Sequence, residues 1–410
     1  MDNSIKEKVD VQHAQDIDYD KLLQAILEIG EQMLIAGAEV SRVEDSIIRL
    51  CQSYDCYKVN VFIITSNMQV TMITPQGKIC TQIRRVYDYG VNFDRLDYLN
   101  DLSRKICREK YPVDRIYVEL EKVMSRPSGG LGRNIFASIL VSAGFAVFFS
   151  GSFRDVISSA IIGVIISLLN NIVFKKEKNL FVSSIAVSFI SGVSAYALVL
   201  TRIGSNVNII MIAGIMILIP GISMTNAIRD MLTGDIATGT LRLLNSVMIA
   251  ISIASGFALS IIIIQLLAAF VGSVGFAMLL NMRGKQVAYA GIGGIISWGI
   301  YLLGYQFTES YFIANFVAAV FVALYAEIMA RVNRAPATIF LTAAAIPLIP
   351  GRNLYLSMYG IVTEDYVNAR INGMTAVVIA LAIGLGIVFI TVIFKFINRY
   401  NSRRNRKNVR

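Results

Sequence analysis

The sequence predicts a polytopic α-helical membrane protein. We expect about ten transmembrane helices, arranged as two inverted five-helix repeats with broken fourth helices, after an N-terminal cytosolic α+β domain. Of the 410 residues, 55% are hydrophobic and 16% are charged, which is unusual for a soluble protein. Apolar runs long enough to cross about 30 Å of hydrocarbon begin only after residue 130. A Leu-Ile-Pro-Gly segment occurs twice, at 218–221 and 348–351.

Residues 1–130 are expected to form the cytosolic domain, because charges recur every few positions and no apolar run reaches spanning length. The first ten residues mix acids and bases, so no cleavable secretory signal is expected. Apolar residues between Leu23 and Ile47 recur at three- and four-residue steps, which predicts a helix face that Gly37 interrupts. The β-branched segments KVNVFIIT, QVTMIT and KICTQIRRV predict strands, and helices are expected near 93–109 and 112–125.

Neither a metal site nor a cofactor is expected. The four cysteines, Cys51, Cys56, Cys80 and Cys107, match no zinc spacing, and the chain has one histidine. Buried thiols kept reduced in the cytosol are the interpretation that we favour. The phosphate-binding pattern G-x-x-x-x-G-K-[ST] does not occur, so nothing indicates ATP as the energy source.

Ten spans are expected after the cytosolic domain. Residues 243–282 hold no Asp, Glu, Lys or Arg and are about twice as long as one crossing, which predicts two spans joined by a tight hairpin. The repeats are expected at 131–262 and 263–398, before a basic tail at 399–410. The expected spans are 134–150, 154–174, 179–201, 205–220, 237–261, 263–282, 286–304, 309–331, 335–350 and 366–397.

The distribution of positive charge predicts that both termini are cytoplasmic. Lys and Arg gather in the connections that share a side with the N-terminal domain, whereas the opposite side has only Arg154, Arg202 and Arg352. The net charge of +10 lies mainly at span ends, and seven Lys or Arg follow from Lys395 onward. This favours contact with anionic membrane lipid over binding of nucleic acid. The oligomeric state stays open, and a homo-oligomer is compatible with the sequence.

The repeated segment predicts two broken helices. Both copies begin Leu-Ile-Pro-Gly and reach Thr-x-Asp at the same distance, with Pro350 at an offset of 130 residues from Pro220 (350 − 220). Proline removes a backbone donor and glycine permits non-helical angles, so each pair should end one helical piece and allow another to start. Each copy follows the fourth span of a set of five, which predicts inverted repeats with a substrate site at the breaks.

The polar residues around the breaks are candidates for binding a small substrate. Hydroxyls and amides would bind its side chain, fresh helix ends its carboxylate, and Asp230 or Asp235 its ammonium. A solvated connecting helix with an Arg-Asp pair is the structural alternative. The candidate binding residues are Pro220, Gly221, Ser223, Thr225, Asn226, Arg229, Asp230, Asp235, Pro350, Gly351, Tyr355 and Tyr359.

A second motif, AGAEVSRVEDSI at 36–47, lies in the cytosolic domain. Glu39, Arg42 and Asp45 are spaced for a salt-bridged ladder on a helix. Ser41 and Glu44 have the spacing of a capping box. Both are structural interpretations, and they outweigh catalysis because no histidine or positioned nucleophile is nearby. We expect this domain to dock under the membrane part and to gate it.

Together, AGAEVSRVEDSI, IPGISMTNAIRDMLTGD and IPLIPGRNLYLSMYG give the chain a resemblance to the threonine/serine exporter family of bacterial inner-membrane proteins. The resemblance covers nearly the whole chain, and the second half looks like a partner component that some relatives carry as a separate polypeptide. It implies export of threonine and serine driven by the proton motive force, and no enzymatic activity. It also marks Glu39, Arg42 and Glu44 in the cytosolic motif.

Other functions remain open on the sequence. Some two-component relatives are associated with export of dicarboxylates such as succinate. A membrane-anchored sensor or scaffold would bind a ligand without flux, and a channel would also use broken helices. An intramembrane aspartyl hydrolase would need Asp230 or Asp235 to meet Asp365 across the two halves.

Overall fold

The computed structural model describes residues 17–64, 67–86, 90–127, 129–175, 177 and 179–407, with side chains up to residue 396. Residues 1–16 of the predicted cytosolic domain, with the histidine, and residues 408–410 of the basic tail therefore lie outside the described residues. The chain divides into two compact units, Met1–Phe257 and Ala258–Arg410. Each unit is described by itself.

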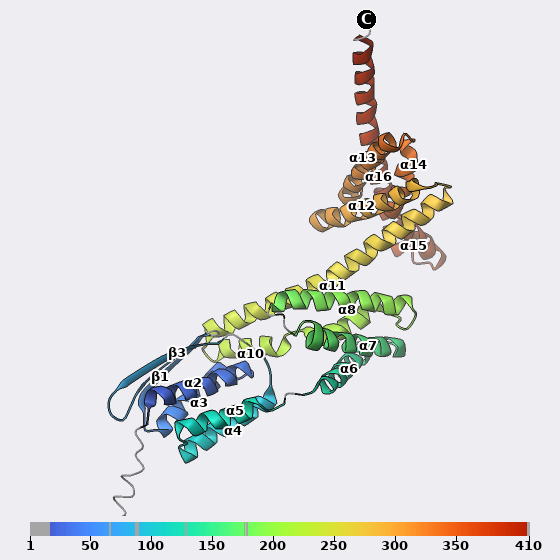
Figure 1. Ribbon diagram of the computed structural model, residues 1–410. Coiled ribbons are helices and arrows are strands. Elements are labelled where there is room, and N and C mark those ends of the chain that lie inside the picture. Colours follow the sequence, from blue (N-terminus) through green and yellow to red (C-terminus); the bar gives the residue numbers. More distant parts are fainter. Residues whose placement is uncertain are drawn as a thin grey trace, which may run out of the picture. The chain divides into compact units, whose positions relative to one another are not determined.

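The first unit begins with a small α+β layer structure (Figure 1). Helices α2 and α3 pack on a three-stranded antiparallel sheet of order β1-β2-β3, and α4 and α5 pack on these helices. The strands lie where the three β-branched segments predicted them, and Gly37, at φ +96°, separates α2 from α3 as predicted. The bounds are α2 Tyr19–Ile35, α3 Val40–Ser53, β1 Tyr57–Ile64, β2 Asn67–Ile73, β3 Ile79–Arg85, α4 Phe93–Glu109 and α5 Val113–Met124.

One continuous apolar core holds these seven elements together. Met68, Val70 and Met72 alternate along β2 and are fully buried, as expected for the inner face of a half-covered sheet. Gly30 lets α2 approach closely, because a Cβ atom there would lie 2.8 Å from Met68 Cε and 2.9 Å from Ile47 Cδ1. This core forms a rigid support for the loop between α2 and α3.

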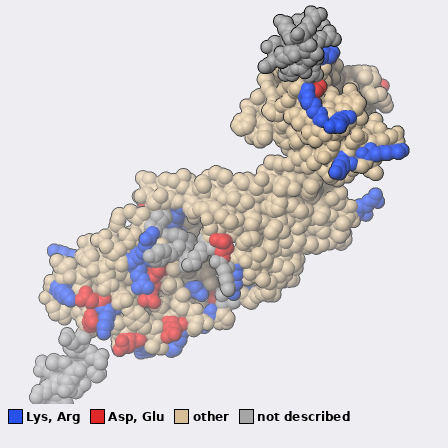
Figure 2. Space-filling view, turned by 45° about the horizontal axis from the view of Figure 1, so that its top comes forward, with Lys and Arg blue, Asp and Glu red and all other residues tan. Residues whose placement is uncertain are grey.

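The rest of the first unit is a group of apolar helices. Charged side chains gather on the α+β part, whereas the surface over the helices is almost free of charge in the view of Figure 2. Helix α7 continues into one π-helical turn, η1, and α9 is followed directly by α10 at a sharp bend. The bounds are α6 Leu131–Phe148, α7 Phe153–Leu168, η1 Leu169–Val173, α8 Leu180–Leu200, α9 Val207–Leu218 and α10 Gly221–Leu232.

The second unit is also helical. Its helices pack through small residues, among them Ala318 and Ala344, which are fully buried in one cluster with Val322 and Leu348. A short 3₁₀ turn, η2, precedes a second sharp bend before α15. The bounds are α12 Lys285–Thr308, α13 Tyr311–Asn333, α14 Ala337–Ala345, η2 Ile346–Leu348, α15 Gly351–Val362 and α16 Tyr366–Lys407.

The described residues contain seven helices that are long and apolar enough to cross a membrane, or up to nine if each bent pair counts as one span. This is the architecture of a polytopic membrane protein. The expected pair of spans at 237–261 and 263–282 with a tight hairpin is wrong in one respect, because α11 runs unbroken over Ile236–Leu279, 44 residues. Residues 258–269, ALSIIIIQLLAA, contain no glycine or proline that would end a helix.

Candidate functional site

Both Leu-Ile-Pro-Gly segments break a helix in the same way. Pro220 has φ −77° and ψ 50°, and Pro350 has φ −77° and ψ 47°. The N–H of Gly221 donates to the Ile219 carbonyl at 2.8 Å, and the N–H of Gly351 donates to Ile349 at 2.7 Å, which closes an inverse γ-turn around each proline. The helices on either side meet at bends of 53° and 51°. The two breaks that the sequence predicts are therefore present with matching geometry.

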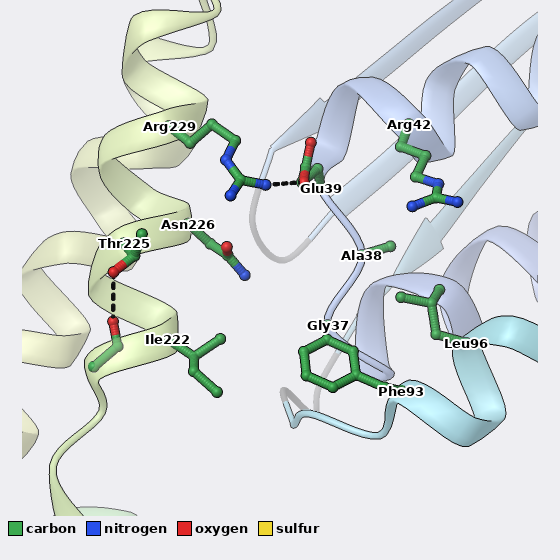
Figure 3. Close-up of a pocket in the computed structure, with 11 residues that line it drawn as sticks. Gly37, Ala38, Glu39, Arg42, Phe93, Leu96, Ile222, Thr225, Asn226 and Arg229 are labelled. Carbon is green, nitrogen blue, oxygen red and sulfur yellow. Dashed lines mark hydrogen bonds and ion pairs between the residues drawn. The ribbon is translucent and has the colours of Figure 1, made fainter.

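Helix α10, which follows the first break, carries two ion pairs on different faces. The guanidinium of Arg229 pairs with the carboxylate of Glu39, which precedes α3 in the α+β part (Figure 3). One residue further on, Asp230 accepts a hydrogen bond from Arg242 of α11 at 2.7 Å. The side chains of Asp230 and Arg242 are only 2% and 14% exposed, whereas those of Glu39 and Arg229 are 33% and 51% exposed. The first pair faces a pocket, and the second is enclosed.

A pocket of about 610 Å³ lies between α10 and the α+β part. Small-molecule sites are typically roughly 300–1,000 Å³, so its size suits a metabolite. Figure 3 shows Ile222, Asn226 and Arg229 reaching from α10 toward the loop that carries Glu39. The Thr225 hydroxyl donates to the Gly221 carbonyl at 3.0 Å, which leaves its oxygen able to accept. The lining residues are Gly37, Ala38, Glu39, Arg42, Phe93, Leu96, Gly221, Ile222, Thr225, Asn226 and Arg229.

A second contact joins the α+β part to the start of α11. The buried Thr238 hydroxyl donates to the carbonyl of Ile63 at 3.3 Å. The backbone of Ile63 is also hydrogen-bonded to the Glu44 carboxyl. Burial, reinforced by the charge of Asp235, raises the pKa of the Glu44 carboxyl, and this hydrogen bond only partly offsets the rise. This environment therefore favours the protonated form of the Glu44 carboxyl.

The candidate residues of the second break form a group of their own in the second unit. Tyr355 and Tyr359 stack with ring centroids 6.0 Å apart and are 64% and 54% exposed. The hydroxyl of Ser357 donates to the Ala369 carbonyl at 2.8 Å, which ties α15 to α16. Pro350 and Gly351 form the bend before them, as Pro220 and Gly221 do in the first unit.

Not every candidate of the first break reaches the pocket. Gly221, Thr225, Asn226 and Arg229 line it together with Glu39 and Arg42, whereas Ser223, Asp230 and Asp235 do not. Asp230 points into the enclosed pair with Arg242, and the Asp235 N–H donates to the Asp230 carbonyl at 2.9 Å. The proposed solvated Arg-Asp pair is wrong for Asp230, because its partner is Arg242 and the pair is buried.

Two structural interpretations of the cytosolic motif are also wrong. The expected ladder of Glu39, Arg42 and Asp45 does not form, because Glu39 pairs with Arg229 and Asp45 pairs with Arg49 at 2.9 Å. The expected capping box does not form either, since the N-cap of α3 is Glu39 without a side-chain cap. Glu39 pairs instead with Arg229 of α10, which the local spacing does not reveal.

Two models of known protein families match the chain. A family model described as "Putative threonine/serine exporter" matches residues 24–264, and a second, "Threonine/Serine exporter, ThrE", matches residues 265–393. The chain belongs to the threonine/serine exporter family. The first match covers both motifs that line the pocket, and the second contains the Pro350 break. In this exporter-family chain, the two components follow one another in a single polypeptide.

Two curated relatives extend over most of the chain at low identity. A probable threonine/serine exporter of Mycobacterium tuberculosis is 21% identical, over 91% of this chain and 76% of its own length. A threonine/serine exporter of Corynebacterium glutamicum is 22% identical, over 93% of this chain and 83% of its own length. No solved structure matches. The family consists of transporters, and the chain is a bacterial membrane protein with multiple spans.

Several residues that line the pocket or fix nearby helices were not singled out from the sequence. Phe93 and Leu96 reach the pocket from α4, and Arg242 neutralises Asp230 from the next helix. Asp155 is 2% exposed and accepts hydrogen bonds from the backbone N–H groups of Ser205 and Asn206 at 2.8 and 2.7 Å. The Ser-x-x-Asp spacing from Ser152 is a capping-box signal that points to Asp155. No comparable local signal points to Phe93, Leu96 or Arg242.

The described residues contain no group of His, Cys, Asp and Glu that could hold a metal ion. Cys51, Cys56 and Cys80 are buried free thiols, and Cys107 is half-buried. Burial raises the pKa of Cys51 to about 12 and that of Cys56 to about 11, so these thiols stay protonated. Such thiols pack as small apolar groups and offer no nucleophile.

Proposed function

We propose that this protein is a secondary active exporter of small hydroxylated amino acids, threonine and serine, driven by the proton motive force across the bacterial cytoplasmic membrane. The observation that carries the proposal is the pair of matching broken helices in a chain of the threonine/serine exporter family. Broken helices at corresponding places in two halves are a recurring way to build a substrate site in secondary transporters.

The polar groups near the two breaks suit the proposed substrates. In the first unit, Asn226 and Thr225 offer an amide and a hydroxyl oxygen beside the charged pair of Glu39 and Arg229. In the second unit, the phenol groups of Tyr355 and Tyr359 follow the break. Hydroxyl and amide partners match a side-chain hydroxyl, and charged partners match the ammonium and carboxylate of a free amino acid. Asp230 would act by holding Arg242 and thereby fixing α10.

Coupling to protons requires a carboxyl whose protonation changes the conformation of the transporter. Glu44 is a candidate, because burial and the charge of Asp235 raise its pKa at the junction between the α+β part and α11. A proton taken up there would weaken their mutual repulsion and favour docking. We therefore propose that protonation of this junction accompanies the conformational cycle.

Alternating access also requires the two breaks to open toward opposite sides. The charges of the second half favour this arrangement, because Arg283, Lys285, Arg331 and Arg334 fall on one side and Arg352 on the other. Inverted repeats require residues 236–279 to cross the membrane twice, so this arrangement needs the 44-residue helix α11, about 66 Å long at about 1.5 Å per residue, to turn back within its apolar run. We propose that the two halves are inverted repeats, that both termini are cytoplasmic, and that the basic tail contacts anionic lipid. A homo-oligomer is compatible with this arrangement.

The purified protein in liposomes provides the test. Liposomes are loaded with labelled threonine, a proton gradient of either sign is imposed, and release is followed over time. The proposal predicts saturable release that depends on the gradient, and competition by unlabelled serine on the releasing side. Release that persists after the gradient is collapsed with an ionophore, without saturation, would indicate a channel instead.

Export of a dicarboxylate such as succinate is the second candidate. It is favoured by the two guanidinium groups, Arg42 and Arg229, at one pocket. In the same liposomes, release of labelled succinate without release of threonine would reassign the substrate, and Arg229 and Arg352 would then be the residues to replace.

A further inference from the structure

The pocket beside α10 is made by two parts of the chain that lie far apart in sequence. Glu39 and Arg42 come from the cytosolic motif, whereas Asn226 and Arg229 come from the helix after the first break. The only ion pair between these groups in the described residues joins Arg229 to Glu39, across a separation of 190 residues. A ligand in the pocket would therefore contact both parts at once.

This ion pair is open enough to exchange partners. The side chains of Arg229 and Glu39 remain 51% and 33% exposed at the pocket wall. The neighbouring pair of Asp230 and Arg242 is 2% and 14% exposed. Exposed pairs contribute little and rearrange readily, whereas an enclosed pair is held by the cost of leaving a buried charge alone. Helix α10 thus has a fixed ion pair on one face and an exchangeable one on the other.

The charges of the pocket favour a zwitterion over a dianion. Glu39 contributes one negative charge, and Arg42 and Arg229 contribute two positive charges. An α-amino acid can place its ammonium on Glu39 and its carboxylate among the two guanidinium groups, which satisfies all three charges. A dicarboxylate would bring a second anion to Glu39 after Glu39 has lost Arg229 as its partner, and this contact between like charges is unfavourable.

The neutral part of the lining suits the rest of an amino acid. Phe93, Leu96 and Ile222 give an apolar wall, while the Thr225 oxygen and the Asn226 amide are able to bind a hydroxyl. The floor is formed by Gly37, whose φ of +96° a larger residue adopts only with strain, and by Gly221. The pocket is therefore lined with charged, hydrogen-bonding and apolar groups in close proximity.

We propose that the cytosolic domain supplies half of the substrate site. The ammonium of a free α-amino acid replaces the Arg229 guanidinium as the partner of the Glu39 carboxylate, and the carboxylate of the amino acid then binds the released Arg229 together with Arg42. The exchange breaks the ion pair between the cytosolic domain and the broken helix. Substrate binding and opening of this contact are therefore one event. This inference rests on the proposed function, because it assigns the amino acid as the ligand of that site.

Binding of two matched ligands to the full-length protein in detergent tests the exchange. The first is L-threonine, and the second is 2,3-dihydroxybutanoate, in which a hydroxyl replaces the ammonium at nearly equal size. The wild type is expected to bind threonine at least about tenfold more tightly. In Glu39→Gln this preference should vanish, whereas Asp45→Asn, which removes an ion pair elsewhere on α3, should retain it. The conservative Glu39→Asp should retain part of it.

Each outcome separates the exchange from the proposed function. If Glu39→Gln keeps both threonine affinity and the preference over the hydroxy acid, the exchange is overturned, and liposome flux by the same variant would leave the exporter function standing. If the wild type binds threonine with the predicted preference but moves none across liposomes, the exchange is supported and the exporter function fails. If the wild type binds no threonine, the exchange is overturned whatever the flux.

Discussion

Replacement of Asp230 should destabilise the protein far more than replacement of its neighbour Arg229. Asp230→Ala leaves the Arg242 guanidinium, 14% exposed, without its carboxylate. Removing one member of a buried ion pair typically costs about 3–5 kcal/mol. Arg242 retains some exposure, so we expect about 3 kcal/mol. For a domain of roughly 150–250 residues, each kcal/mol shifts Tm by about 2–4 °C, which predicts a loss of about 6 °C or more.

Thermal unfolding of the purified protein in detergent, followed by circular dichroism, measures this shift. Arg229→Ala is the matched control, because its exposed pair with Glu39 is worth at most about 1 kcal/mol and should change Tm by only a few degrees. The double variant Asp230→Leu with Arg242→Met should recover much of the loss, since apolar groups of similar size often replace a buried pair at little cost. Equal Tm values for Asp230→Ala and Arg229→Ala would refute the reasoning.

Three further predictions follow from the fold and the site. Pro220→Ala or Pro350→Ala should restore a helical hydrogen bond and reduce threonine flux severalfold in liposomes without reducing membrane insertion. Unchanged flux in both variants would show that the helix breaks are not needed for transport. Since the folded-state pKa of Glu44 is raised above 4.5, its contribution to stability is present at low pH and is lost as pH rises through the raised pKa. Glu44→Gln should therefore raise Tm at pH 8 relative to wild type and flatten the decline in Tm that begins above the ordinary glutamate pKa, whereas a parallel decline in the variant would contradict this origin. Maleimide should modify half-buried Cys107 before Cys51 in the native protein, as peptide mass spectrometry would detect, and the reverse order would show that burial does not protect Cys51.

Local features of the fold could be predicted from the sequence because their causes are local. Gly37 separates two helices through its own backbone conformation, and each Pro-Gly pair breaks a helix by removing a donor at that point. The β-branched segment QVTMIT predicted strand β2 at the place where the structure has it. These signals need no knowledge of what lies across the fold.

The pairing of charges could not be predicted, because it depends on tertiary contacts. Glu39 finds Arg229 at a separation of 190 residues rather than Arg42 on its own helix. Asp230 finds Arg242 after the chain turns at Gly234, whose φ of +109° allows the next helix to pack back on α10. The hairpin expected within residues 243–282 rested on the length of the apolar run alone, whereas residues 258–269 contain no glycine or proline that would end a helix, and α11 is continuous there.

Labelling of matched positions in the two halves tests the central claim, that the breaks belong to inverted repeats. Leu232 and Val362 occupy equivalent places after the two breaks and are 83% and 81% exposed. Each is replaced by cysteine, intact cells are treated with a membrane-impermeant maleimide, and modification is read at the peptide level. The account predicts that Val362→Cys is modified in intact cells and Leu232→Cys only after permeabilisation. Modification of both from the same side would contradict it and would mean that α11 crosses the membrane once.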